Sequence, residues 1–125
     1  MAAATGHSRT VGRLKKRSEF LAVAAGNRRC AMPGLVVQAL ALPPEASPSI
    51  RVGFTATKKI GNAVARNRAR RRLRAAAHEV LRRGDGEPRP SDLVLVARQG
   101  TIERPYGELL TDLRRALKRL EVLAP

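Results

Sequence analysis

Apolar residues follow two different spacings along the chain, and these separate the expected strands from the expected helices. Residues 35–42 form a β-type apolar run, and residues 50–57 carry an apolar side chain at every second position. The turn-rich segment 43–49 between them predicts a β-hairpin with a long loop. A further continuous apolar run at residues 93–97 is typical of a buried strand.

Three segments have patterns that predict helices, and two of them have the three- and four-residue apolar spacing of an amphipathic helix. A short helix is expected between Ser18, which can cap its start, and Gly26, which can end it. The longest helical segment spans residues 63–83, and a Leu-rich final helix begins at Pro105. The residues expected on the buried face of the long helix are Ala69, Leu73, Ala76, Ala77 and Val80.

The order helix, strand, strand, helix, strand, helix predicts the α/β (α+β) class, with helices packed on a small mixed sheet. A chain of 125 residues is expected to form one hydrophobic core. We assign residues 1–12 to a flexible N-terminal tail, residues 13–121 to a single domain and residues 122–125 to a C-terminal tail.

The charge of the chain points to a polyanionic partner. Lys and Arg number 25 against 10 Asp and Glu, a formal net charge of +15, and such a surface favours nucleic acid or an anionic membrane. We favour nucleic acid and expect no membrane partner, because no apolar run approaches the roughly 20 residues of a spanning helix and the basic helix carries Ala instead of bulky anchors opposite its charges. Codon composition is an equally good account of the abundance of Arg and Ala.

The sequence shows neither a secretory signal nor a cluster of catalytic side chains. Without a secretory signal the protein is expected in the cytoplasm, with Cys30 as a reduced thiol. A nuclease acting alone needs clustered carboxylates or positioned acid and base groups. Asp85 and Glu87 lie in a Gly/Pro turn, His7 lies in the N-terminal tail, and His78 lies on the flank of a helix. We therefore expect no catalytic residue, no metal site and no cofactor bound by the protein alone.

Basic residues gather around the first turns of the long helix. Cations there oppose the helix dipole, so a sequence selected for stability alone would avoid them. Docked phosphates would relieve the repulsion, and Asn62 and Asn67 add groups for sugar hydroxyls or base edges. A solvated helix face is the alternative. We favour RNA binding, because the charges surround the first turns instead of lying opposite the core.

Residues 52–75, with Arg-Asn-Arg at positions 66–68, resemble the signature of the bacterial ribonuclease P protein family. Further likeness comes from Arg13-Leu14-Lys15 with Phe20, from residues 92–98 and from the Leu-rich final helix. The resemblance covers residues 13–120.

The resemblance implies a protein that binds a catalytic RNA and the 5′ leader of precursor tRNA, in a cleft beside the sheet. The RNA would perform the hydrolysis with Mg²⁺, and no protein partner is implied. The implied fold is the ribosomal protein S5 domain 2-like fold with a left-handed crossover, an exception to the usual right-handed rule. The residues expected at the catalytic RNA are Lys59, Asn62, Arg66, Asn67, Arg68, Arg70, Arg71, Arg72 and Arg74. Those expected at the leader are Arg13, Lys15, Lys16, Arg17, Phe20 and Lys58.

Aromatic residues are few. Phe20 is expected to face the cleft and stack on a leader base, although a place in the core is the alternative. Phe54 is expected to be buried, and Tyr106 at a helix start is ambiguous. Family members often carry further aromatics where this chain has Ala24, Leu35, Val36 and Val37. Leader binding is therefore expected to rely more on charge.

Three other functions compete with this interpretation. A ribosomal or general RNA-chaperone protein would have a similar fold. A DNA-binding regulator would need two adjacent helices, whereas a strand separates the last two long helices here. A protein-only nuclease would cleave RNA without any RNA subunit.

Overall fold

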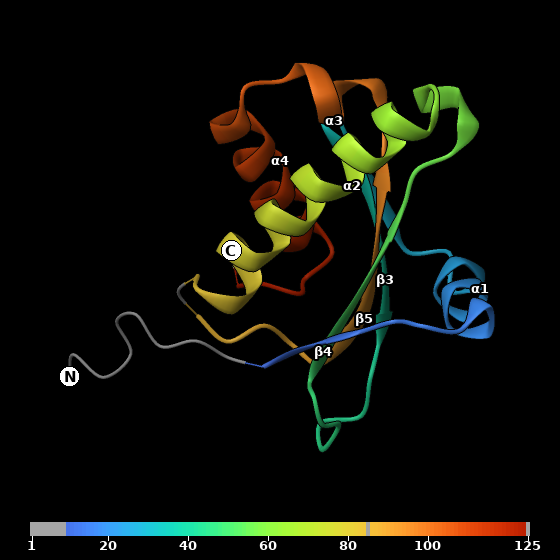
Figure 1. Cartoon of the computed structure of the whole chain (residues 1–125). Coiled ribbons are helices and arrows are strands. Elements are labelled where there is room, and N and C mark those ends of the chain that lie inside the picture. The colour runs from blue at the N-terminus through green and yellow to red at the C-terminus, as the bar shows by residue number, and fades with distance from the viewer. Residues whose placement is uncertain (1–9, 85, 125) are drawn as a thin grey trace.

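Five strands form one mixed sheet in the spatial order β1-β4-β5-β3-β2 (Figure 1). They belong to a computed structural model that describes residues 10–84 and 86–124. The predicted α/β (α+β) class is confirmed. The elements, in chain order, are β1 (Val11–Arg13), α1 (Arg17–Ala25), β2 (Arg29–Met32), β3 (Leu35–Ala41), β4 (Ile50–Thr55), the 3-10 helix η2 (Lys58–Ile60), α2 (Ala63–Ala77), its π-helical continuation η3 (His78–Arg82), β5 (Ser91–Ala97), α3 (Gln99–Glu103) and α4 (Tyr106–Arg119).

Strand β5 lies between β3 and β4, antiparallel to the former and parallel to the latter. The predicted hairpin of residues 35–42 and 50–57 is therefore wrong. The physical reason is burial: six of the seven residues of β5 are buried, which suits a central strand covered on both faces. The connection from β4 through α2 to β5 is a parallel crossover, and it places the basic helix against the sheet.

The hairpin that does form joins β2 to β3 through Pro33 and Gly34, with Arg29 opposite Gln38 and Met32 opposite Leu35. Strand β2 was not predicted, because its sequence Arg-Cys-Ala-Met lacks a clear apolar alternation. The short helix α3 was missed for a similar reason.

Both predicted domain boundaries fall inside the folded domain. Val11 and Gly12, assigned to the tail, form β1 and pair in parallel with β4 at Ile50 and Arg51. At the other end, Val122 is buried in the core, and its carbonyl accepts a hydrogen bond from the backbone N–H of Arg89. The predicted tail residues 1–9 and 125 lie outside the described residues, as do His7 and Asp85.

Helices cover both faces of the sheet (Figure 1). α2 and α4 pack on one face and form the main core, in which the predicted face of α2 is buried as expected. α1 covers part of the other face, where a smaller cluster contains Leu14, Val23 and Val94, with Phe20 packed against it. The sheet thus separates an α1 side from an α2 side.

Helix α1 begins at Arg17, one residue before the predicted cap Ser18, and the carboxylate of Glu19 caps its start. Oε1 of Glu19 accepts hydrogen bonds from the backbone N–H groups of Lys15 and Lys16, at 2.8 and 2.9 Å. A carboxylate stabilises free N–H groups at a helix start more strongly than a hydroxyl does. Gly26 ends the helix as predicted.

Candidate nucleic-acid interface

The start of α2 is held by a short, tightly turned segment. Ile60 is buried and anchors η2 to the core, and Gly61 has a φ of 140°, a conformation that favours glycine. Asn62 then caps the helix, because its Oδ1 accepts from the backbone N–H of Ala65 at 2.9 Å. One acceptor of Asn62 is thus already used by the protein, whereas Lys58 and Lys59 project from η2 as exposed cations.

The Arg-Asn-Arg segment carries charges that the protein does not neutralise. Nη1 of Arg66 donates to the carbonyl of Gly61 at 3.2 Å, and Nη1 of Arg70 donates to Oδ1 of Asn67 at 3.0 Å. None of Arg66, Arg68 and Arg70 forms an ion pair with any residue that the structure describes. The guanidinium groups of this segment therefore keep their full charge for an external anion.

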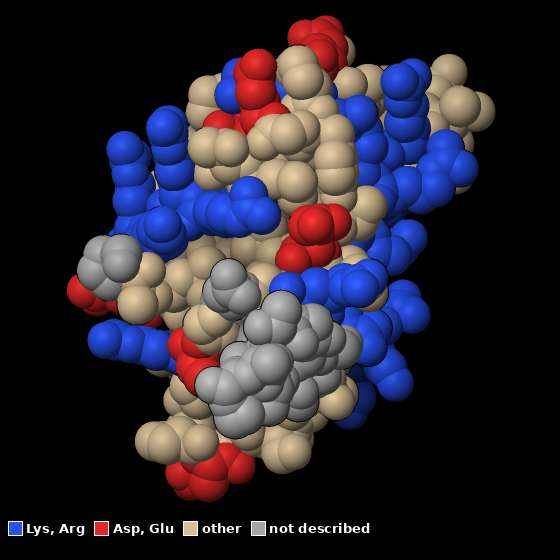
Figure 2. Space-filling model, turned by 90° about the vertical axis from the view of Figure 1, so that its left-hand side faces the viewer, with Lys and Arg blue, Asp and Glu red and all other residues tan. Residues whose placement is uncertain are grey.

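Basic side chains continue along the same side of the molecule. Arg68, Arg71 and Arg74 are exposed on α2. In Figure 2, Lys and Arg side chains form an almost continuous column down the right-hand side, which is the side of α2. A column of this kind suits the phosphate backbone of a nucleic acid, to which positively charged side chains bind without reading sequence.

Arg72 is placed differently from the other predicted RNA contacts. It is half-buried, its Nη2 donates to the carbonyl of Arg104, and its guanidinium lies 6.0 Å from the ring centroid of Tyr106. Arg72 therefore ties α2 to the junction of α3 and α4. Tyr106 is 37% exposed beside it, and burial, followed by the charge of Glu79, raises the pKa of Tyr106.

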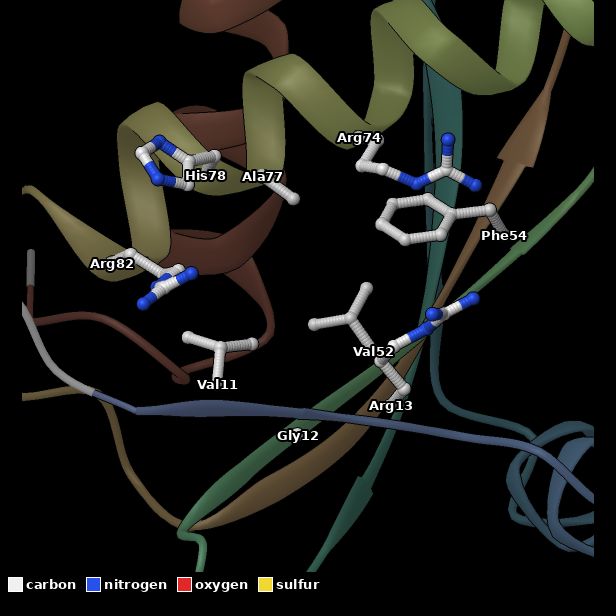
Figure 3. Close-up of a pocket in the computed structure, with 9 residues that line it drawn as sticks. All are labelled: Val11, Gly12, Arg13, Val52, Phe54, Arg74, Ala77, His78 and Arg82. Carbon is white, nitrogen blue, oxygen red and sulfur yellow. The ribbon is translucent and has the colours of Figure 1, made fainter.

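Phe54 is not buried as predicted. Its ring is half-exposed under the guanidinium of Arg74, which lies 5.5 Å from the ring centroid (Figure 3). The reason is position: Phe54 lies near the end of β4, where α2 crosses the sheet without covering the space toward β1 (Figure 3). The apolar alternation along β4 predicts which side chains face α2, but it does not predict how much of the strand the helix covers.

A hollow of about 240 Å³ opens beside Phe54, between β1, β4 and the end of α2 (Figure 3). Three arginines and one histidine stand around an apolar floor, and none of the described residues that line it is acidic. These lining residues are Val11, Gly12, Arg13, Val52, Phe54, Arg74, Ala77, His78 and Arg82. Sequence reasoning missed this hollow, because its residues come from three separate segments and form no motif.

Phe20 lies on the opposite face of the sheet. It is half-buried, packs against the cluster of Leu14, Val23 and Val94, and lies directly on Gly53 of β4. The ring therefore belongs partly to the small core and partly to the surface of the α1 side, which combines the two alternatives considered for it.

The predicted leader-binding residues do not form a single cluster. Successive residues of a strand point to opposite faces, so Arg13 lines the hollow on the α2 side, whereas Leu14 packs beside Phe20 on the α1 side. Lys15, Lys16 and Arg17 are exposed at the start of α1. Arg13 and Arg74, which were expected at different RNAs, line the same hollow.

The described residues contain no group of three or more His, Cys, Asp or Glu that could hold a metal ion. None of their helices is both long enough and apolar enough to cross a membrane.

The fold and the uncompensated basic helix together define a nucleic-acid-binding domain. The family model for ribonuclease P matches residues 9–121. The ribonuclease P protein component of Gluconacetobacter diazotrophicus is 52% identical over 111 residues, covering 88% of this chain and 91% of that protein. The corresponding protein of Paramagnetospirillum magneticum is 50% identical over 113 residues, covering 89% and 84%.

Solved structures show the same fold. The RNase P protein of Staphylococcus aureus matches with a TM-score of 0.68 and 24% identity, over 89% of this chain and 96% of that one. The RNase P protein of Thermotoga maritima matches with a TM-score of 0.69 and 24% identity, over 86% and 96%.

The chain therefore belongs to the ribonuclease P protein family, as its central motif indicated. It is a protein component of the ribonuclease P ribonucleoprotein, an endoribonuclease that takes part in tRNA 5′ processing, and it has an RNA partner in that assembly.

Proposed function

We propose that this chain binds a catalytic RNA subunit through the start of α2 and holds the 5′ leader of precursor tRNA along the α1 side of the sheet. The RNA subunit carries out the hydrolysis with Mg²⁺, and the protein supplies charge and position. The assembly acts in the cytoplasm.

The uncompensated charges of Arg66, Arg68 and Arg70 carry this proposal. They lie where a helix leaves its loop, with no carboxylate partner among the described residues. Elsewhere in the fold, Arg51 and Arg104 do have carboxylate partners: Glu19 and Asp92 pair with Arg51, and Glu108 and Asp112 pair with Arg104. A folded polynucleotide is the partner that can neutralise so dense a group of cations.

The leader assignment rests on the α1 side. Lys15, Lys16 and Arg17 are exposed and Phe20 is half-buried one turn further along the chain, where its backbone N–H donates to the carbonyl of Lys16 at 3.4 Å. Phosphates at the lysines would bring a base within reach of the ring, and a base stacked on an aromatic side chain contributes roughly 1 to 3 kcal/mol. Because this contact involves the leader alone, it favours precursor over mature tRNA.

The protein has a physical route to lowering the Mg²⁺ requirement of the reaction. Cations placed on the RNA replace part of its counterion atmosphere and reduce repulsion between its phosphates. An RNA subunit bound to this chain should therefore fold and cleave at lower Mg²⁺ than the RNA alone.

Reconstitution tests the proposal directly. The purified chain is added to a bacterial ribonuclease P RNA at low Mg²⁺, and cleavage of precursor tRNA is followed over time. We expect cleavage at the 5′ leader junction only when both components are present, with tighter binding of precursor than of mature tRNA. Cleavage by the chain alone would place the chemistry in the protein, and no stimulation of the RNA would refute the proposal.

A further inference from the structure

The hollow beside Phe54 has an apolar part and a cationic part, which match the base and the phosphate of a single nucleotide. Its floor is apolar, formed by Val11, Val52 and Ala77 with the Phe54 ring, and its rim carries Arg13 and Arg74 (Figure 3). A nucleobase is flat and largely apolar on its faces, whereas the attached phosphate is anionic. Aromatic contact with arginine nearby is the usual protein solution for an unpaired base.

The volume limits the occupant to something small. About 240 Å³ is below the roughly 300 to 1,000 Å³ of an ordinary small-molecule site. One base fits such a space better than a base pair or a peptide segment. The described lining carries basic and apolar side chains without an acidic one, which favours an anion over a basic peptide.

The hollow is continuous with the basic row of α2. Arg66, Arg70 and Arg74 recur at every fourth position, so they follow one side of the helix from its start to the hollow. A single-stranded RNA segment whose phosphates bind this row of arginines, starting at the Arg-Asn-Arg segment, would reach the hollow at Arg74. Phe20, the expected leader contact, lies on the other face of the sheet.

We infer that the hollow between β1, β4 and α2 binds one unpaired nucleotide of the RNA subunit, with its base against Val11, Val52 and Phe54 and its phosphates at Arg13 and Arg74. This inference rests on the proposed function and deepens it. It also moves Arg13 from the leader to the RNA subunit.

Affinity measurements with the RNA subunit test the chemistry of the hollow. At 150 mM salt we expect Arg13→Gln and Arg74→Gln each to weaken binding about tenfold, as the loss of a charge-assisted hydrogen bond implies. Each should also reduce the slope of log affinity against log salt by about one. Val11→Trp, which fills the hollow without changing charge, should weaken binding at least about fivefold with an unchanged slope, since a base–aromatic contact is lost.

Arg83→Gln is the matched control. It removes the same charge from an exposed position just after η3, outside this hollow. It should change affinity less than twofold, about the size of a general charge effect. Thermal unfolding of every variant establishes that the domain remains folded. If Val11→Trp and Arg74→Gln bind as well as Arg83→Gln, the inference is refuted.

Crosslinking identifies the source of the nucleotide. A photoreactive group is attached to Val11→Cys in a Cys30→Ser background, which leaves one thiol in the chain. We expect a crosslink to one position of the RNA subunit, unchanged when precursor tRNA is omitted. A crosslink to the leader instead would overturn the assignment. If the wild-type chain itself fails to bind the RNA subunit, the proposed function is refuted. If the wild-type chain binds and the hollow variants bind with the same affinity, only the inference about the hollow is refuted.

Discussion

The ring of Phe20 lies directly on the backbone of Gly53. A Cβ atom at position 53 would stand 2.4 Å from Cε2 of Phe20, closer than carbon atoms can approach. Helix α1 is thereby seated on β4 through a residue that must have no side chain. The same contact keeps the Phe20 ring at the surface of the sheet, where the leader is proposed to lie.

Substituting Gly53 with Ala should destabilise the domain by about 1 to 3 kcal/mol, because the added methyl group overpacks the contact with Phe20. Urea unfolding measures this change. Gly107→Ala is the control, since a Cβ there meets nothing within 4 Å. In the background of Phe20→Leu the Gly53→Ala substitution should cost clearly less. Additive effects of the two substitutions would show that the contact is not the cause.

The carboxylate of Asp92 is buried and bound in a fork by Arg51. Nε and Nη2 of Arg51 donate to its two oxygens at 2.7 and 2.6 Å. Replacement of Asp92 by Asn removes the negative charge of this ion pair. The Arg51 side chain is 32% exposed, so water can partly solvate the guanidinium that is left without its partner. We expect Asp92→Asn to lower the free energy of unfolding by about 2 to 3 kcal/mol, below the range for fully buried pairs. A loss under 0.5 kcal/mol in urea unfolding would contradict this account of the pair.

Glu19 should make the stability depend on acid pH. Backbone hydrogen bonds from Lys16 and then Lys15, with a smaller contribution from Arg51, lower the pKa of Glu19 from its usual 4.5. A lowered folded-state pKa stabilises the protein above pH 4.5, and this stabilisation is lost as the pH falls through the lowered pKa. The difference in melting temperature between wild type and Glu19→Gln should therefore shrink below that pH. Glu45→Gln, which removes a carboxylate from an exposed loop, is the matched control for the change in net charge.

The Arg-Asn-Arg segment should dominate RNA affinity. We expect Arg66→Ala and Arg68→Ala each to weaken binding to the RNA subunit by about 1 to 2 kcal/mol and to flatten its salt dependence. Arg115→Ala, on the exposed face of α4, removes the same charge from outside the proposed interface. Filter binding at near-physiological Mg²⁺ measures all three. Equal affinities would leave the segment without an assigned role.

Sequence patterns predicted the helices more reliably than the sheet. The buried face of α2 follows from helical spacing, which is a local property of Ala69, Leu73 and Ala76. Which strands pair is decided by distant partners, so the place of β5 between β3 and β4 could not be read from either flanking strand. Only the continuous apolar character of residues 93–97 signalled a central position.

The candidate functional residues show the same contrast. Arg66 and Arg68 belong to one short motif on one helix, and the motif itself revealed the family. The hollow requires Arg13, Phe54 and Arg74, which β1, β4 and α2 bring together only after the parallel pairing of the sheet is made. Charge and motif therefore predict an interface at the start of α2, whereas the hollow beside Phe54 becomes visible only in the tertiary structure.

The place of β5 has a consequence for the order in which the chain can fold. β3 and β4 do not pair with each other, and each pairs with β5, so the sheet cannot be completed until residues 91–97 have been synthesised. The arginine-rich helix thus leaves the ribosome before the platform that orients it exists, and non-local parallel pairing is slow to form. A nascent chain in this state carries concentrated positive charge without a defined shape, so RNA met during synthesis would be held by charge alone until the last strand is inserted.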